Sequence, residues 1–336
     1  MRIAGLDLLR GIAVALVVLR HAFPSVFPGA GVVGVVMFFA LSGYLITGLL
    51  LGELERDGRV DLRRFYARRA WRLVPALLLL VVGVVLVTVI LDPLGDRDEL
   101  LRTVLVALTW TGNLPFTHGS DATFHLWTLA TEEQFYLVWP ACLALAVTRG
   151  RVPLALALAG LASLAACLAT VLWLRGSPDL AYALPTSWAG CFVIGAATRV
   201  LADRVDVPAR TLALGVPLAL LGLGVLSVVP LRGHALTYLA GGPAIALLTA
   251  VLLLSWRSRA TVPGPALNAV VWLGTVSYAA YLWNYPLTLW LRPHLDLAGP
   301  VAAALTVVAA ALSWRLVEGP VQRLGERRRA RETVVA

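Results

Sequence analysis

The chain has 336 residues, of which 59% are hydrophobic and only 14% charged, and its mean hydropathy is +0.82. These values exclude an ordinary soluble domain and predict a membrane protein, because spans of about 20 residues take up most of this length. All 28 basic residues are arginine, and the formal net charge is +9. We attribute this charge to cytoplasmic loops that face anionic lipid, and we expect no nucleic-acid partner.

Ten apolar runs are long enough to cross a bilayer. They occupy residues 6–22, 32–51, 73–91, 126–148, 152–174, 185–201, 211–229, 236–255, 267–291 and 298–317. With the N-terminus inside, 21 arginines fall in inner segments and six in outer ones, which predicts that both termini are cytoplasmic. The expected fold class is all-α, a polytopic membrane helix bundle of about ten transmembrane helices. We expect residues 1–320 to form one membrane domain and residues 321–336 a short basic cytoplasmic tail.

The first run carries two ionisable side chains on one face. Arg10 and His21 are separated by eleven helical steps of about 100°, so their side chains align about 16 Å apart along the axis. Ionisable groups inside a membrane are functional candidates by default. Asp7, one turn before Arg10, offers a plainer explanation for the arginine alone, as a neutralising partner near the interface. It does not explain His21.

The segment around the second and third runs contains small residues and a dense group of arginines. Ser42, in MFFALSGYLITG, is interpreted first as a small residue at a helix contact. The connection over residues 52–72 is expected to be a cytoplasmic loop that ends in arginines. Arg69 and Arg72 present two guanidiniums on one face, which suits phosphate oxygens, whereas Arg68 fits ordinary positive-inside topology. Residues 92–125 form an outer connection with room for one short amphipathic helix.

The fourth run contains two adjacent carboxylates, Glu132 and Glu133, about two turns from its outer end. Adjacent residues point to different faces of a helix, so at least one carboxylate is expected to turn toward a partner or a cavity. Glu132 is the better interior candidate, because Tyr136 shares its face at i, i+4. Glu133 is equally well explained as an exchangeable carboxylate that pairs with an outer arginine.

The ninth run, through SYAAYLWNYPL, places Tyr281 and Asn284 in its outer half. By depth, His21, Glu132 and Asn284 are all expected in the outer third, where a helix bundle can gather them around one pocket. The alternative for Asn284 is a simple hydrogen bond to a neighbouring helix.

No metal site is predicted. The other histidines fall in outer connections without the spacing of metal ligands. They are His118, His125, His234 and His294.

Six motifs occur in order along nearly the whole chain. They are LDLLRGIAVALVVLRH, FFALSGYLI from Phe38, the Arg69 and Arg72 pair, WTLATEEQFY from Trp127, SYAAYLWNYP from Ser277, and VEGP from Val317. Together they resemble the acyltransferase-3 family of integral membrane enzymes, which O-acylate surface sugars and natural products. Asn284 departs from the family pattern, since many relatives have a histidine there, and Gly319 replaces a frequent basic residue. No hydrolase-like domain follows the last run, so the chain resembles the stand-alone members.

The resemblance implies transfer of an acyl group, expected to be acetyl, from acyl-CoA to a hydroxyl of a carbohydrate or natural product. His21 and Glu132 match the catalytic positions. His21 would act as general base or transient acyl carrier, and Glu132 would orient its imidazole. Arg10, Arg69 and Arg72 would hold the donor. Ser42, Tyr136, Tyr281 and Asn284 are the expected pocket residues.

The expected partners are therefore acetyl-CoA as co-substrate, the acceptor and the lipid bilayer, with no bound cofactor. The expected location is the bacterial cytoplasmic membrane, as a multi-pass protein. Two other classes stay open. A transporter or flippase would use Arg10, His21 and Glu132 as a polar relay, and release of thiol from acyl-CoA distinguishes it from an enzyme. A scaffold would tolerate His21→Ala. The acceptor's identity and the oligomeric state are left open.

Overall fold

A computed structural model describes residues 3–114, 117, 119–205 and 207–325. All regular secondary structure in this part of the chain is helical, which confirms the all-α prediction. His118 and residues 326–336, most of the expected basic tail, lie outside the described residues. The chain divides into two compact units, and each is described by itself. Unit 1 comprises residues 1–60, 113–115 and 127–275, and unit 2 comprises residues 61–112, 116–126 and 276–336.

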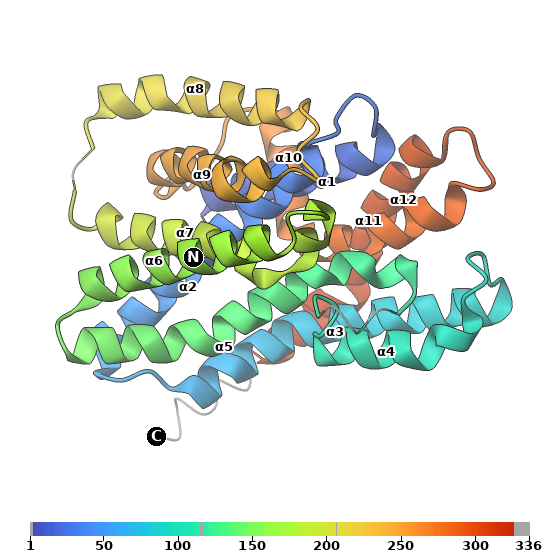
Figure 1. Cartoon of the computed structure of the whole chain (residues 1–336), viewed down its shortest axis with the longest axis horizontal. Coiled ribbons are helices and arrows are strands. Elements are labelled where there is room, and N and C mark those ends of the chain that lie inside the picture. Colours follow the sequence, from blue (N-terminus) through green and yellow to red (C-terminus); the bar gives the residue numbers. More distant parts are fainter. Residues whose placement is uncertain (1–2, 115–116, 118, 206, 326–336) are drawn as a thin grey trace. The chain divides into compact units, whose positions relative to one another are not determined.

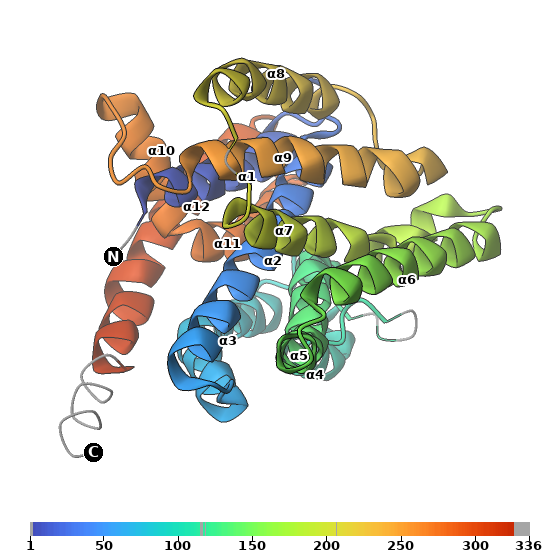
Figure 2. The same cartoon turned by 90° about the vertical axis from the view of Figure 1, so that its left-hand side faces the viewer.

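Unit 1 contains eight α-helices. They are α1 (Ala4–Ala22), α2 (Ala30–Asp57), α5 (Trp127–Thr148), α6 (Val152–Trp173), α7 (Ala189–Ala202), α8 (Ala209–Ser227), α9 (Gly242–Trp256) and α10 (Pro265–Thr275). Helix α2 is the centre of this unit, because it packs against α1, α5, α7, α8 and α9. Figure 1 shows α6 beside α7, and Figure 2 shows α9 between α7 and α8, in agreement with the packing of these pairs.

Glycines bring the backbones of unit 1 close together. A Cβ built on Gly43 of α2 would overlap the carbonyl oxygen of Phe192, and one built on Gly195 of α7 would overlap that of Ala40. Without a side chain at these points, α2 and α7 can pack backbone to backbone, as small residues allow in membrane helix pairs.

Helices α1 and α2 form an antiparallel pair with a definite register. Gly31 of α2 faces the side chain of Arg20, and Gly34 faces Val17 and the carbonyl oxygen of Ala13. The last turn of α1 therefore lies beside the first turn of α2. Each residue further along α2 meets a residue correspondingly earlier in α1, which sets the depth of every side chain on this pair.

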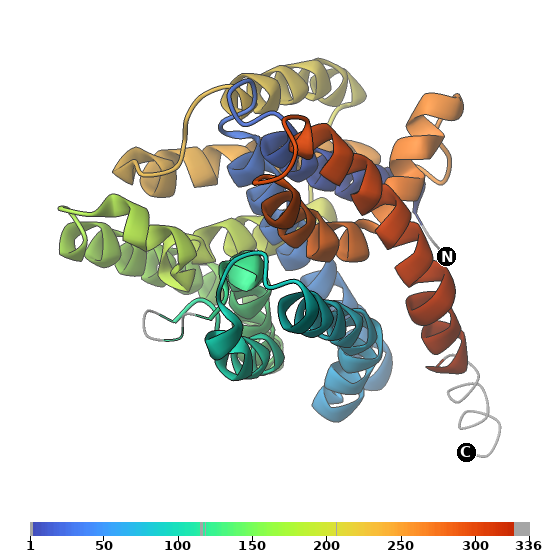
Figure 3. The same ribbon diagram turned by 90° about the vertical axis from the view of Figure 1, so that its right-hand side faces the viewer.

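Unit 2 contains four α-helices and a 3₁₀ turn at Asp121–Leu126. The helices are α3 (Leu62–Ile90), α4 (Leu100–Thr109), α11 (Ser277–Leu291) and α12 (Ala298–Ser313). Figure 3 shows α11 and α12 side by side, the closest helix pair in this unit, and α3 packs against both α4 and α11. After α12, a π turn at Trp314–Glu318 leads into further helix.

Six of the described helical segments are long and apolar enough to cross a membrane. They are Ala30–Asp57, Leu62–Ile90, Val152–Trp173, Ala209–Ser227, Thr237–Trp256 and Ala298–Gly325. Several are mostly exposed despite their apolar composition, with only 11% of the window in α8 and 17% of that in α6 buried. Exposed apolar helix faces are what lipid requires and water disfavours, so the chain is a multi-pass membrane protein.

Two boundaries differ from the sequence prediction. The cytoplasmic loop expected over residues 52–72 is only four residues long, because α2 continues to Asp57 and α3 begins at Leu62. Asp61 caps α3, its side chain accepting the backbone N–H of Arg64 at 2.9 Å. The arginines of this region are therefore held on a helix. The short helix expected in the outer connection is present as α4.

The ninth predicted span is not one continuous helix. It breaks at Val276, where φ is −104° and ψ is 11°, into α10 and α11. Helix α10 packs closely on α1, because a Cβ built on Gly274 would overlap the carbonyl oxygen of Asp7. Apolar periodicity continues through the break, so the sequence pattern alone did not reveal it.

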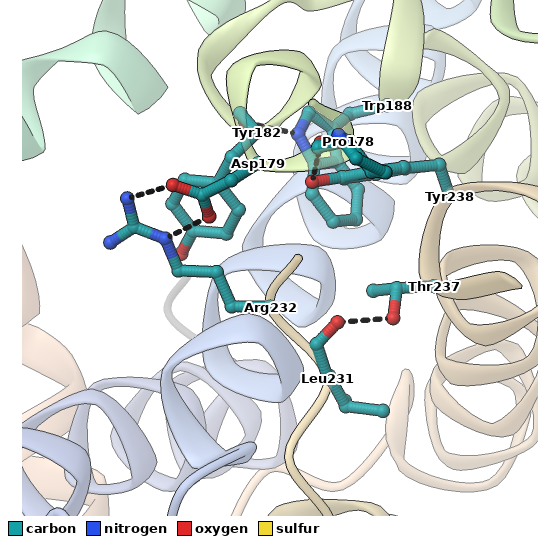
Figure 4. A network of polar contacts seen from close by, with 8 residues as sticks. All are labelled: Pro178, Asp179, Tyr182, Trp188, Leu231, Arg232, Thr237 and Tyr238. Atoms are coloured by element: carbon teal, nitrogen blue, oxygen red, sulfur yellow. Dashed lines mark hydrogen bonds and ion pairs between the residues drawn. The ribbon is translucent and has the colours of Figure 1, made fainter. Parts of the chain in front are cut away.

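The connections after α6 and α8 of unit 1 are joined by a cluster of polar contacts (Figure 4). Asp179 accepts two hydrogen bonds from Arg232, at 2.8 and 3.2 Å, and the guanidinium lies 4.7 Å from the ring centre of Tyr182. Tyr238 donates to the carbonyl oxygen of Pro178 at 3.0 Å, and Trp188 to that of Tyr182 at 2.8 Å. We call this set the loop clasp.

Candidate active site

Glu132 lies at the centre of a hydrogen-bonded group in unit 1. Ser42 of α2 donates its hydroxyl to Oε1 of Glu132 at 3.2 Å, and Tyr136 donates its phenol to Oε2 at 3.2 Å. Tyr136 is buried and lies one turn after Glu132 on α5, so the expected i, i+4 pairing is present. Each carboxylate oxygen is thus held by a hydroxyl donor.

Two neighbouring hydrogen bonds fix α5 in place. Trp139 donates its indole N–H to Thr47 of α2 at 2.9 Å, one and a half turns beyond the Ser42 contact. Asn113 and Gln134 exchange side-chain amide hydrogen bonds of 2.8 and 3.0 Å. The first contact prevents α5 from rotating against α2. The second fixes the turn of α5 that carries Glu132, so the carboxylate has a defined position.

Arg10 pairs with Asp7 on α1. Their side chains make a hydrogen-bonded ion pair of 3.0 Å, with Arg10 22% exposed and Asp7 only 9%. The neutralising partner considered from the sequence is therefore present. A guanidinium has five N–H donors, so a single carboxylate contact leaves it able to bind a further anion.

His21 lies in the last turn of α1 and is half-buried. Its depth relative to Glu132 differs from the prediction. Ser42 lies eleven residues along α2 from Gly31, the glycine that faces Arg20, and this corresponds to about 16 Å of helix. The register of the α1 and α2 pair thus places the Ser42–Glu132 contact level with Arg10. It does not lie level with His21, because Glu132 is deeper than the outer third in which both were expected.

Unit 2 holds the other two expected pocket residues. Tyr281 donates its phenol to the carbonyl oxygen of His125 at 2.9 Å, and Asn284 donates its side-chain amide to Thr306 of α12 at 3.2 Å. Both residues are buried. The helix-to-helix hydrogen bond considered for Asn284 is therefore present.

Sequence reasoning missed His125 as a buried group. It was expected in an outer connection, but it is only 4% exposed, and its Nε2 lies 3.0 Å from the carbonyl oxygen of Leu282. Its ring also contacts the rings of Tyr281 and Tyr285, with centroids 5.5 and 5.2 Å apart. The position of His125 two residues before the Trp127 motif was the available signal.

Arg69 and Arg72 lie in the first half of α3, within unit 2. Arg69 is half-buried and Arg72 exposed. Their spacing on a helix places both guanidiniums on one face, as predicted from i, i+3. Within the part of the chain that the structure describes, no three His, Cys, Asp or Glu side chains form a group suited to a metal ion.

Comparison with known proteins identifies the class. A family profile described as an acyltransferase domain matches residues 3–317. The chain is 29% identical to the peptidoglycan O-acetyltransferase OatA of Listeria monocytogenes over 96% of its own length and 56% of that protein. It is 30% identical to the putative peptidoglycan O-acetyltransferase YrhL of Bacillus subtilis, over 99% of its own length and 57% of that protein.

A third relative is the O-acetyltransferase OatA of Staphylococcus aureus, 27% identical over 96% of this chain and 57% of that protein. The chain thus spans slightly more than half the length of the curated relatives it matches. No solved structure matches. Since the profile covers almost the whole chain, the protein belongs to the acyltransferase 3 family of membrane acyltransferases.

Proposed function

We propose that this protein is a membrane O-acyltransferase that moves an acetyl group from acetyl-CoA to a hydroxyl of a carbohydrate acceptor. The observation that carries the proposal is the family match over residues 3–317. It is supported by the names of the relatives, which describe O-acetyl transfer to peptidoglycan. Natural-product acceptors remain within the same chemistry.

His21 is the proposed reacting residue. In direct transfer, its neutral imidazole takes the proton of the acceptor hydroxyl while the oxygen attacks the thioester carbonyl. The carbon–sulfur bond then breaks, and the imidazolium returns the proton to the leaving thiolate. In the covalent route, the imidazole nitrogen attacks first, the thiolate leaves, and the acceptor hydroxyl displaces the acyl-imidazole.

Arg10, Arg69 and Arg72 are proposed to bind the phosphate groups of the donor, because guanidiniums match phosphate oxygens in charge and shape. Tyr281 and Asn284 remain proposed pocket residues of unit 2.

Glu132 is proposed to act on the donor side of His21. Its carboxylate is held by Ser42 and Tyr136 level with Arg10, where it can accept an amide N–H of the donor's pantetheine arm. This role replaces the orienting contact to the imidazole, which the register of the α1 and α2 pair does not favour.

The decisive experiment uses the full-length protein purified in lipid nanodiscs. Release of free thiol from acetyl-CoA is measured with a soluble peptidoglycan fragment as acceptor, and the product is identified by mass spectrometry. His21→Ala should abolish both signals. Thiol-dependent acetylation by the wild type supports the proposal. Failure to release thiol with several donors and acceptors, together with solute transport in vesicles, would instead establish a transporter.

The two routes differ when the donor is added alone. A covalent intermediate would appear as a protein mass increase of one acetyl group that is absent in His21→Ala. Strictly ternary kinetics without that adduct would establish direct transfer.

A further inference from the structure

A cavity of about 510 Å³ opens in unit 1, separate from the Glu132 group. It lies where the first turn of α1, the middle of α2, the last turn of α7 and the residues after α9 meet. Its lining combines apolar, aromatic and charged side chains: Ile3, Leu6, Tyr44, Leu45, Gly48, Arg199, Asp203, Arg257 and Ser258. A cavity of this size matches those that hold small organic ligands.

Two arginines share one carboxylate at the rim. Arg199 makes an ion pair with Asp203 on α7, and Arg257 approaches the other oxygen of Asp203 at 4.0 Å. Arg257 also donates to the carbonyl oxygen of Ala202 at 2.5 Å. The rim therefore carries one excess positive charge. Two guanidiniums offer ten N–H donors, more than these contacts engage among the described residues.

The opposite wall is flat and apolar. The buried ring of Tyr44 lies beneath Arg199, whose guanidinium carbon is 5.9 Å from the ring centre, and Leu6 and Leu45 extend the wall. Gly48 makes room for Arg199, because a Cβ there would come within 2.6 Å of its Nε. This combination of an aromatic wall and paired guanidiniums suits a planar ring that carries phosphate groups.

The start of α1 is anchored beside this wall. The backbone N–H of Gly5 donates to the carbonyl oxygen of Arg259 at 3.0 Å, and a Cβ on Gly5 would overlap the carbonyl oxygen of Trp256. The two ends of the polypeptide segment that form the cavity are therefore joined by backbone contacts, and the cavity is a built feature of unit 1.

The cavity continues toward the proposed reacting residues along two helices. Leu6 of α1 precedes Arg10 by one turn on the same face, and Leu45 of α2 follows Ser42 by nearly one turn. From Leu6 to His21 the helix rises about 22 Å. A ligand with its head in the cavity and an extended arm along α1 would pass Arg10 and Glu132 before it reached His21.

We propose that this cavity binds the phosphorylated nucleoside end of the acyl-CoA donor, with Arg199 and Arg257 on its phosphate groups and Tyr44 beside its ring. The inference rests on the proposed function, because it assigns a place to that donor. The arginine distribution puts this end of α1, α7 and α9 on the cytoplasmic side, where acyl-CoA is found. Asp203 opposes an anion in this cavity, and that opposition provides the sharpest test.

The test measures KM in nanodiscs for two donors, acetyl-CoA and S-acetylpantetheine, which lacks the nucleotide. Arg257→Gln and Arg199→Gln should each raise KM for acetyl-CoA about tenfold, roughly the effect of losing one charge-assisted contact, with unchanged kcat and unchanged KM for S-acetylpantetheine. Asp203→Asn should lower the Kd of coenzyme A several-fold, because removing the negative charge favours the phosphate. The matched control is Arg232→Gln, an ion-paired arginine of the loop clasp, which should leave both donors unaffected.

Calorimetric titration with coenzyme A separates this inference from the proposed function. Equal KM changes for both donors in the arginine variants, or weaker binding in Asp203→Asn, would overturn the site. If coenzyme A binding is unchanged in these variants while retention of phosphatidylglycerol is lost, the cavity holds an anionic lipid headgroup and the inference fails. Absence of thiol release by the wild type would refute the proposed function instead.

Discussion

Ser42 and Glu132, ninety residues apart in the chain, meet through a hydrogen bond of 3.2 Å between the serine hydroxyl and the glutamate carboxylate. This contact joins α2 to α5. It also gives Ser42 a role beyond that of a small residue at a helix contact.

Ser42→Ala should reduce kcat/KM for acetyl transfer about tenfold. A hydrogen bond to a charged group contributes about 1.5–3 kcal/mol, and losing this one releases one oxygen of the Glu132 carboxylate. The measurement is thiol release in nanodiscs. Thr47→Val on the same helix is the control, since it removes a hydroxyl bonded to Trp139 and should lower thermal stability without a comparable loss of activity. An active Ser42→Ala variant would contradict a functional role for this contact.

Glu132→Gln should raise KM for acetyl-CoA and leave the pH dependence of kcat in place. The amide retains the shape of the carboxylate but loses its charge, and the α1 and α2 register separates it from His21 by about 16 Å of helix. The measurement is a pH series of kcat and KM. A displaced pH profile with constant KM would restore the orienting role that the sequence suggested.

Gly274→Ala should destabilise unit 1 by about 1–3 kcal/mol, the usual effect of forcing extra atoms into a packed site. The added Cβ would overlap the carbonyl oxygen of Asp7, so α10 must move away from α1. Gly224→Ala on α8 is the matched control, because no atom lies within 4 Å of its Cβ position. That variant should be neutral or stabilised by up to about 1 kcal/mol. Thermal unfolding in detergent compares the two, and equal midpoints would contradict the close approach.

The ion pair of the loop clasp should contribute little to stability. Arg232 and Asp179 are 47% and 57% exposed, and pairs this accessible to solvent couple by about 0.2–1 kcal/mol. A double-mutant cycle with Arg232→Gln and Asp179→Asn measures the coupling, which should decrease as salt is raised. A coupling above about 3 kcal/mol would show that the clasp is shielded from water, as buried pairs are.

Labelling of single cysteines tests the ten-span topology. With the native cysteines replaced, His234→Cys should react with a membrane-impermeant maleimide in intact cells, and Arg204→Cys only after permeabilisation. The arginine bias places the first outside and the second inside. The reverse pattern would invert the predicted orientation.

The sequence alone determined what depends on composition and on local periodicity. Apolar runs of membrane length predicted the helices, and the i, i+4 spacing placed Tyr136 on the carboxylate of Glu132, because both follow from the geometry of a single helix. The ordered motifs predicted the family. Spacing also predicted Asp7 as the partner of Arg10.

The tertiary structure decided what depends on residues distant in the chain. The Ser42 contact, the depth of Glu132, the burial of His125 and the pairing of Arg199 with Arg257 around Asp203 all require helices to meet in a particular register. That register comes from glycines such as Gly34 and Gly43, where a missing Cβ lets two backbones approach. Hydrophobic periodicity reports which face of a helix is buried but not which neighbour covers it, so no single helix could reveal these relationships.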